Sequence, residues 1–178
     1  HAWFIRTRPK VQDVFKALWK TDELVVSFDG ACYVSKDNMK SRDKIWTHTD
    51  QASTCSDLQC YQGFVSLTEN KERSLVVYEG SHKLHETYFK DRGMCDTKNW
   101  QLIDHDYLEE IKGLKKVLHV PAGALVVWDS RTFHQNQLGK PGSEERLVQY
   151  VSYLPKDGPK NSKAMRTKRL KYLQDQRT

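Results

Sequence analysis

The pattern of apolar and polar positions predicts a mainly β chain with helices near its two ends. After Pro9, apolar residues recur at the spacing of a helix and would form one apolar face. Further along, eight short runs rich in Val, Tyr, Phe and Trp are alternating or wholly apolar and are divided by Gly, Asn and Asp, as is typical of strands. These runs span residues 24–28, 31–34, 45–50, 60–67, 74–78, 116–120, 124–128 and 147–154.

A polar insert, residues 84–113, separates two groups of these strands. Its second half, 104–113, predicts a short helix that ends at a glycine, and residues 160–176 predict a basic helix. Strands and helices do not alternate, which argues against a doubly wound α/β sheet and favours a sandwich or jelly roll. We expect one domain over residues 1–178, with a basic helical segment at 160–178.

Composition agrees with this interpretation and bounds the cellular setting. The chain has 178 residues, of which 38% are hydrophobic and 29% charged, and no apolar run reaches the roughly 18 to 20 residues that a membrane helix needs. No secretory signal pattern opens the sequence. The four cysteines form no C-x-x-C pair and are too sparse for a disulfide scaffold, so we expect reduced thiols in a cytoplasmic protein.

The positive charge belongs to the C-terminal segment. The formal net charge is +6, and residues 160–178 contain seven basic residues and one acidic residue, so the preceding part is neutral. The segment could contact the phosphates of a nucleic acid. It could also be a solvated helix that packs on the domain through Leu170 and Leu173, which we favour.

The strongest local candidate for chemistry is the run from Trp46 to Asp50. On a strand, residues two apart point to the same face, so His48 and Asp50 would project together, with Trp46 beside them. One imidazole and one carboxylate are two thirds of a facial triad for Fe(II). A chance H-x-D with a purely structural role is the alternative.

Two further candidates lie downstream. His134 follows a buried strand and a polar turn, and the alternative for it is a hydrogen-bonded structural histidine. Arg146, twelve residues after His134, opens the strand at 147–154. An arginine at the start of a core strand is costly to bury unless it meets an anion, which could be a ligand carboxylate or the protein's own Glu144 or Glu145.

Together, His48-x-Asp50, the distant His134 and Arg146 resemble the Fe(II)/2-oxoglutarate-dependent dioxygenases. Within them the chain is similar to the phytanoyl-CoA dioxygenase-like (PhyH) family, and the resemblance covers about residues 8–177. The run from Gly80 to Lys83 resembles that family's P-G-S-H turn, with Glu79 in place of the proline, and the run from Pro121 to His134 resembles its strand leading into the distal histidine.

The resemblance implies a double-stranded β-helix (jelly roll, cupin-like) and an enzyme that uses iron. His48, Asp50 and His134 would hold Fe(II), Arg146 would pair with the C5 carboxylate of 2-oxoglutarate, and Gln62 would be a further cosubstrate contact. The reaction would couple decarboxylation of 2-oxoglutarate, giving succinate and CO₂, to hydroxylation of a small-molecule substrate by O₂. Hydroxylation is preferred over halogenation because Asp50 is present. A second anchor for the distal carboxylate is not identified.

Two other functions stay open. The chain could be a non-catalytic jelly-roll module that binds a metal or ligand, or a nucleic-acid-associated protein that acts through residues 160–177. The strand after Arg146 lacks the further arginine expected of nucleobase-demethylating relatives. The insert at 84–113 is expected to form part of the site's mouth, where loops commonly set specificity.

Overall fold

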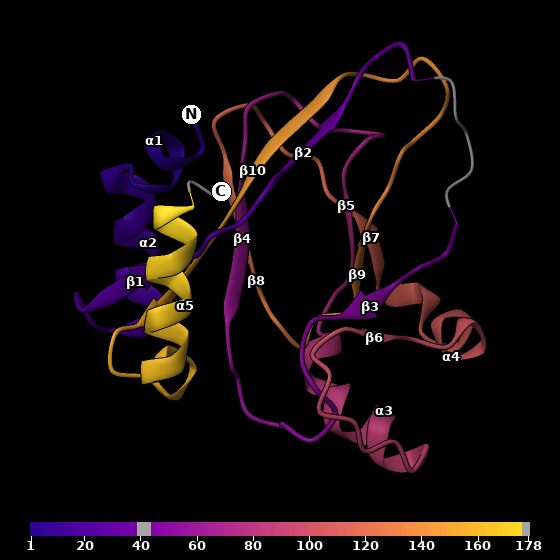
Figure 1. The fold of residues 1–178 in the computed structure, drawn as a ribbon. Coiled ribbons are helices and arrows are strands. Elements are labelled where there is room, and N and C mark those ends of the chain that lie inside the picture. Colours follow the sequence, from indigo (N-terminus) through magenta and orange to yellow (C-terminus); the bar gives the residue numbers. More distant parts are fainter. Residues whose placement is uncertain (39–43, 176–178) are drawn as a thin grey trace.

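Two antiparallel sheets form the body of the protein (Figure 1), as described by a computed structural model for residues 1–38 and 44–175. The first sheet has the order β1-β10-β4-β8, with β2 also paired to β10, and the second has the order β6-β3-β9-β5-β7. The strands of the first sheet are β1 (Leu24–Val26), β2 (Ala31–Val34), β4 (Tyr61–Ser66), β8 (Leu125–Asp129) and β10 (Arg146–Pro155). Those of the second are β3 (His48–Thr49), β5 (Leu75–Tyr78), β6 (Gln101–Leu102), β7 (Lys115–Val117) and β9 (His134–Asn136). The predicted class, mainly β with flanking helices in a double-stranded β-helix, is confirmed.

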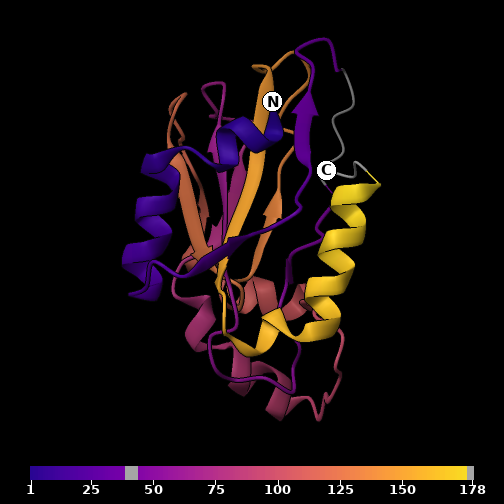
Figure 2. The same cartoon turned by 60° about the vertical axis from the view of Figure 1, so that its left-hand side comes forward.

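Helices lie on the side of the first sheet that faces away from the second sheet (Figures 1 and 2). They are α1 (Ala2–Arg6), α2 (Pro9–Trp19) and α5 (Lys163–Gln174). Phe15 of α2 is fully buried against Val151 and Tyr153 of β10. The predicted apolar face covers the sheet through Val11, Phe15 and Trp19, whereas Val14 and Leu18 of that face are exposed.

The long strand β10 contributes side chains to two apolar layers, because successive side chains alternate between the faces of a sheet. Val151 and Tyr153 face α2, whereas Val148 and Tyr150 belong to the cluster between the sheets, which is built around Phe64. Arg146 and Ser152 share the inner face with Val148 by the same alternation. This inner face forms one wall of the site described below.

The insert between β5 and β7 packs at the edge of the second sheet (Figure 1). It contains α3 (His85–Asp91) and α4 (His105–Glu110). Short 3₁₀ turns lie at Ser81–Lys83 and Lys112–Leu114, and a third, Pro159–Asn161, follows β10. Phe89, Leu108 and Phe133 are buried together beneath these helices. The cluster fixes the insert against the sheet that carries the two histidines.

Sequence and structure differ mainly in short elements. The strand predicted at 45–50 is reduced to β3, the helix predicted at 104–113 is α4, and the one predicted at 160–176 is α5. The sequence pattern does not predict the helices α1 and α3 or the strands β6 and β9. The four cysteines are free. Within the described part of the chain, every helix is too short or too polar to cross a bilayer.

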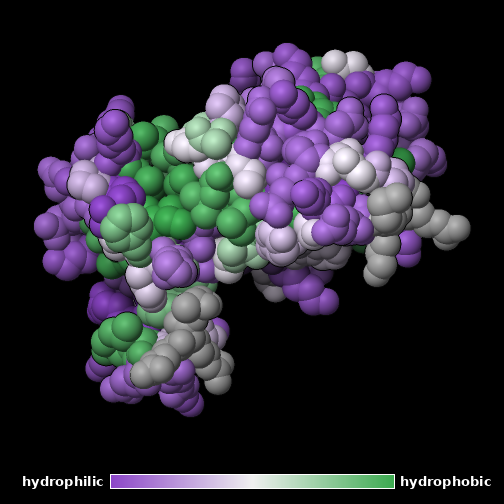
Figure 3. Space-filling model, turned by 90° about the horizontal axis from the view of Figure 1, so that it is seen from above, coloured by the Kyte–Doolittle hydropathy of each residue, from purple (hydrophilic) through white to green (hydrophobic). Residues whose placement is uncertain are grey.

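The end of the molecule that carries the N-terminus shows an apolar area among polar surface (Figure 3). A cleft of ≈ 470 Å³ lies between α1 and the first sheet and is lined by side chains such as Phe4, Ile5, Leu67 and Leu147. This cleft shares no lining residue with the candidate metal centre.

Candidate metal centre

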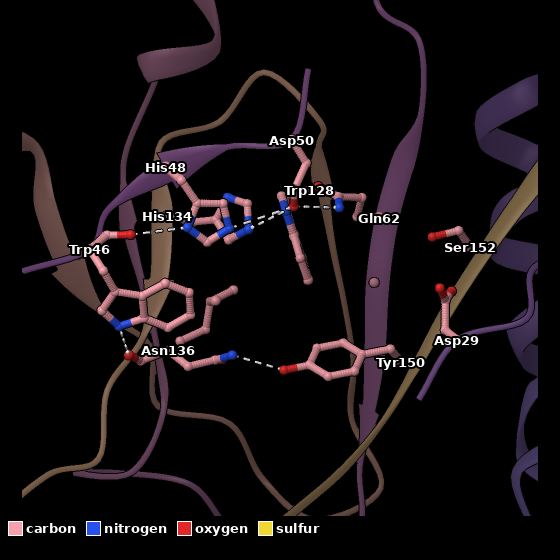
Figure 4. Close-up of a pocket in the computed structure, with 12 residues that line it drawn as sticks. Asp29, Trp46, His48, Asp50, Gln62, Trp128, His134, Asn136, Tyr150 and Ser152 are labelled. Carbon is pink, nitrogen blue, oxygen red and sulfur yellow. Dashed lines mark hydrogen bonds and ion pairs between the residues drawn. The ribbon is translucent and has the colours of Figure 1, made fainter. Parts of the chain in front are cut away.

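The pairing of β3 with β9 brings together two histidines that are distant in sequence. His48 lies directly opposite His134 in this antiparallel ladder, and their ring centroids are 4.5 Å apart. Asp50 follows β3, where its backbone N–H donates to the Ser130 carbonyl at 3.1 Å. The three residues offer one ligand atom each, and these atoms lie within 4.8 Å of one another (Figure 4).

Hydrogen bonds to the backbone fix which nitrogen of each ring is free. Nδ1 of His48 is 3.1 Å from the Trp46 carbonyl oxygen, and Nδ1 of His134 is 2.9 Å from the Thr132 carbonyl oxygen. A carbonyl oxygen only accepts, so each Nδ1 carries a proton, and in the neutral form of each ring the lone pair lies on Nε2. Metal-ligating histidines are commonly oriented by such second hydrogen bonds.

Both Nε2 atoms face the same oxygen of Asp50. Oδ2 lies 3.7 Å from Nε2 of His48 and 3.4 Å from Nε2 of His134. Two lone pairs and a carboxylate oxygen would repel one another, so these three atoms need either a proton on Nε2 or a metal cation between them. Two imidazoles and one carboxylate are the donor set of the facial triad, which binds Fe(II) in non-haem oxygenases, so these residues fit that metal.

Gln62 of β4 holds the carboxylate from the other side. Its Nε2 donates to Oδ2 of Asp50 at 2.8 Å. Burial by itself raises the pKa of Asp50, but hydrogen bonds outweigh burial and keep this pKa well below its usual range. They come from His134 and His48, which donate when Nε2 holds a proton in place of a metal, and from Gln62. The carboxylate is therefore ionised, as a metal ligand must be.

Three tryptophans surround the histidine rings. The Trp46 ring stacks on His48, with centroids 5.0 Å apart and an interplanar angle of 20°, and Trp100 lies 5.4 Å away. Trp128 lies 5.3 Å from His134. These contacts restrict rotation of the imidazoles. Trp100 comes from the 84–113 insert, so that segment does reach the centre, as the sequence predicted.

The triad lies at one end of a cavity of ≈ 210 Å³ between the two sheets. At the other end, Asn136 of β9 donates from Nδ2 to the hydroxyl oxygen of Tyr150 at 2.8 Å (Figure 4). Burial raises the pKa of Tyr150, so its phenol stays protonated. Because the Asn136 amide uses an oxygen lone pair of Tyr150, the O–H proton of Tyr150 can be donated to another acceptor.

Arg146 lies behind this far wall and is fully buried. Its guanidinium donates to Oδ1 of Asn136 at 2.9 Å, and its Nε has no hydrogen-bond partner among the described residues. Pairing with Glu144 or Glu145 was the alternative, but Glu144 accepts from backbone N–H groups and Glu145 accepts from Tyr33. Within the described chain no carboxylate pairs with Arg146, and a buried charge of this kind calls for an anion.

Sequence reasoning missed Asn136, which contacts both Arg146 and the cavity. It stands two residues after His134, so a strand at that point would have placed both on one face. The aromatic residues Trp46, Trp128 and Tyr150 line the cavity. Tyr61 instead packs against Trp19.

The bond from Gln62 to Asp50 predicts a measurable effect on metal affinity. Replacing Gln62 with methionine keeps the side-chain length and removes the donor, so metal affinity should fall by about 10- to 100-fold, as is typical when a residue that orients a ligand is lost. The measurement is a Co(II) titration followed by the d–d absorption of the bound ion. The variant Gln12→Met on α2 is the matched control, and equal affinities for Gln62→Met and this control would contradict a positioning role.

Comparison with known proteins identifies the fold of the chain but assigns it to no family. No family model matches the chain. The chain is similar to "Ava biosynthesis cluster protein O" of Aspergillus versicolor, with 33% identity over 183 residues that cover 94% of the chain and 58% of the relative. The chain thus spans little more than half of the curated relative that it matches.

Solved structures share the fold at low sequence identity. The non-haem monooxygenase ThoJ in its apo form superposes with a TM-score of 0.57 at 15% identity, covering 84% of this chain and 53% of ThoJ. EctD from S. alaskensis, solved with 2-oxoglutarate and 5-hydroxyectoine, gives a TM-score of 0.55 at 18% identity, covering 84% and 50%. The epimerase SnoN, in complex with Fe³⁺, alpha-ketoglutarate and nogalamycin RO, gives 0.52 at 14%, covering 84% and 57%.

Proposed function

We propose that the chain carries the active site of an Fe(II)- and 2-oxoglutarate-dependent dioxygenase that hydroxylates a small molecule. One observation carries the proposal. Two imidazole Nε2 atoms and a carboxylate oxygen converge at one end of a cavity, and behind its other end lies a buried arginine that pairs with no carboxylate among the described residues. The first feature suits a metal and the second suits a dicarboxylate.

His48, Asp50 and His134 would hold the metal. Bound Fe(II) supplies the redox chemistry by which 2-oxoglutarate, O₂ and substrate C–H become succinate, CO₂ and substrate C–OH. The backbone carbonyls that hold each Nδ1–H keep the rings in the ligating tautomer. Gln62, predicted as a cosubstrate contact, is assigned here a different part: it positions Asp50.

Arg146, Asn136 and Tyr150 would bind the distal carboxylate of the cosubstrate. His134 and Asn136 are two residues apart on β9, about 6.6 to 6.8 Å along a strand, which suits the span of a five-carbon dicarboxylate. The guanidinium supplies the charge and the phenol a further donor, while the amide of Asn136 fixes both. Asn136 and Tyr150 are thus proposed as the second anchor.

The names of the similar proteins support this assignment. EctD and SnoN were both solved with 2-oxoglutarate, SnoN also with iron, and the Aspergillus relative is named for a biosynthesis cluster. The narrower resemblance to PhyH proteins stays a prediction. Asp50 favours hydroxylation, because its carboxylate fills the position that halide would need.

The deciding experiment is an anaerobic titration of the apo-protein with Fe(II) and then 2-oxoglutarate. A visible charge-transfer band should appear with 2-oxoglutarate, because its keto oxygen and C1 carboxylate can chelate the metal. Glutarate, which has both carboxylates and no keto group, is the matched control and should give no band. A folded protein that binds Fe(II) and yields no band with 2-oxoglutarate would contradict the proposal and favour a non-catalytic metal-binding module.

A further inference from the structure

A second chamber adjoins the first on the side of Gln62. It measures ≈ 270 Å³ and shares Asp29, Asp50, Gln62 and Ser152 with the cavity of the triad. Under the proposed function, the end of the first cavity near Arg146 takes the cosubstrate. The second chamber then remains for the molecule to be hydroxylated, and the four shared residues line its boundary with the metal site.

The walls of the second chamber are polar. Its lining consists of carboxylates, amides, hydroxyls, a thiol and one amine, with Leu154 as its one aliphatic side chain. Burial raises the pKa of Cys60 to about 11, so this thiol is uncharged at neutral pH. An aliphatic acyl chain would gain little here, because apolar burial is the source of its affinity. The chamber suits a compact, hydrogen-bonding molecule.

Asp29 places at this boundary a carboxylate that no described cation contacts directly, although Arg6 lies near enough to interact with its charge. Among the described residues, its carboxylate accepts one hydrogen bond, from the Ser27 hydroxyl, and forms no ion pair. The neighbouring guanidinium of Arg6 donates instead to the backbone carbonyls of Ser27 and Asp29, at 3.0 and 2.6 Å. In Figure 4, Asp29 and Ser152 lie together, across the cavity from the histidines.

Gln62 adds a second acceptor at the same boundary. Its Nε2 donates to the carboxylate of Asp50, which fixes the orientation of the amide because a carboxylate only accepts. Its Oε1 is buried and has no hydrogen-bond partner within the described chain. Burying an acceptor without a donor costs free energy. A ligand that donates an N–H or O–H group to Oε1 of Gln62 would remove this cost.

Two cations lie near the chamber, Arg6 beside Asp29 and Lys160 on the lining, and neither forms an ion pair with Asp29. Asp50 belongs to the triad, where its carboxylate contacts the two histidines and Gln62. Lys160 lines both this chamber and a separate cleft that is also lined by Trp19. Lys160 forms no ion pair with a described residue, so its ammonium is not held against Asp29. A ligand cation would meet Asp29 and Gln62 on the metal side of the chamber.

We propose that the substrate is a compact polar molecule with a cationic nitrogen, an ammonium or a guanidinium, and that Asp29 selects it. The cation donates to the carboxylate of Asp29, and another N–H or O–H group of the ligand donates to Oε1 of Gln62, which places the adjoining carbon atoms towards the triad. That this ligand is the substrate rests on the proposed function. The cation site itself is a property of Asp29 and can be tested separately.

The test compares n-butylguanidinium with n-butylurea, which has nearly the same shape and no charge. Their dissociation constants are measured by saturation-transfer NMR on metal-free protein and on protein loaded with Fe(II) and 2-oxoglutarate under nitrogen. Wild type should bind the guanidinium at least about tenfold more tightly, since a hydrogen bond to a charged group contributes on the order of 1.5 to 3 kcal/mol. n-Butylammonium should share the preference.

Asp29→Asn should abolish the preference, because the amide still accepts from Ser27 but carries no charge. Asp29→Glu should retain part of it, and Asp157→Asn, which removes an exposed charge on the turn after β10, should leave it unchanged. Equal binding of guanidinium and urea by wild type, or a preference that survives in Asp29→Asn, overturns the inference.

The two proposals fail separately. A charge-transfer band without a preference for the cation would overturn the cation site and leave the dioxygenase. A preference for the cation without any band would support the cation site and contradict the dioxygenase.

Discussion

His134→Ala should abolish specific binding of Fe(II), and the charge-transfer band with 2-oxoglutarate should vanish with it. The loss removes one of three ligand atoms that lie within 4.8 Å of one another and leaves an imidazole and a carboxylate from a single strand end. We expect affinity to fall by more than the roughly 10- to 100-fold that follows loss of a residue outside the ligand set. Metal binding is measured by anaerobic titration with a competing chromophoric chelator.

The design separates ligation from folding. His134 is buried and its Nδ1 lies 2.9 Å from the Thr132 carbonyl, so thermal unfolding of the variant must be recorded beside the titration. His134→Gln, which fills more of the space, provides a second variant. His105→Ala removes an exposed histidine and is the matched control. A folded His134→Ala protein that binds Fe(II) as tightly as the control would remove His134 from the ligand set.

The longer elements could be predicted because their patterns are local. The apolar face of α2 and the alternation along β10 each extend over a continuous run of about ten residues. By contrast, β9 is His-Gln-Asn, three polar residues without alternating hydrophobicity, and it exists because β3 and β5 pair with it on both sides. Tertiary pairing of this kind leaves no signal in the segment itself.

The candidate site divides in the same way. That His48 and Asp50 share a face follows from the two-residue period of a strand. That His134 lies opposite His48 depends on a register between strands far apart in sequence. The resemblance to a family implied that the two histidines share a metal, but neither it nor periodicity predicted this register. The bond from Gln62 to Asp50 depends on the packing of one sheet on the other, so this contact could be found only from the structure.

Arg146→Met should weaken binding of 2-oxoglutarate strongly and leave metal binding nearly intact. The guanidinium is buried, reaches Asn136 at 2.9 Å and meets no carboxylate among the described residues. Removing one partner of a buried, hydrogen-bonded charge pair costs on the order of 2 to 5 kcal/mol, so the dissociation constant should rise at least about 30-fold. The charge-transfer band, titrated with 2-oxoglutarate on Fe(II)-loaded protein, reports it directly.

A second ligand distinguishes a carboxylate anchor from a structural arginine. 2-Oxobutyrate can chelate the metal as 2-oxoglutarate does, but it has no distal carboxylate. Wild type should bind 2-oxoglutarate far more tightly than 2-oxobutyrate, whereas Arg146→Met should bind both with similar, weak affinity. If Arg146→Met instead loses Fe(II) and both oxo acids in equal measure, Arg146 supports the fold of the cavity, and the assignment of its guanidinium to the distal carboxylate is wrong.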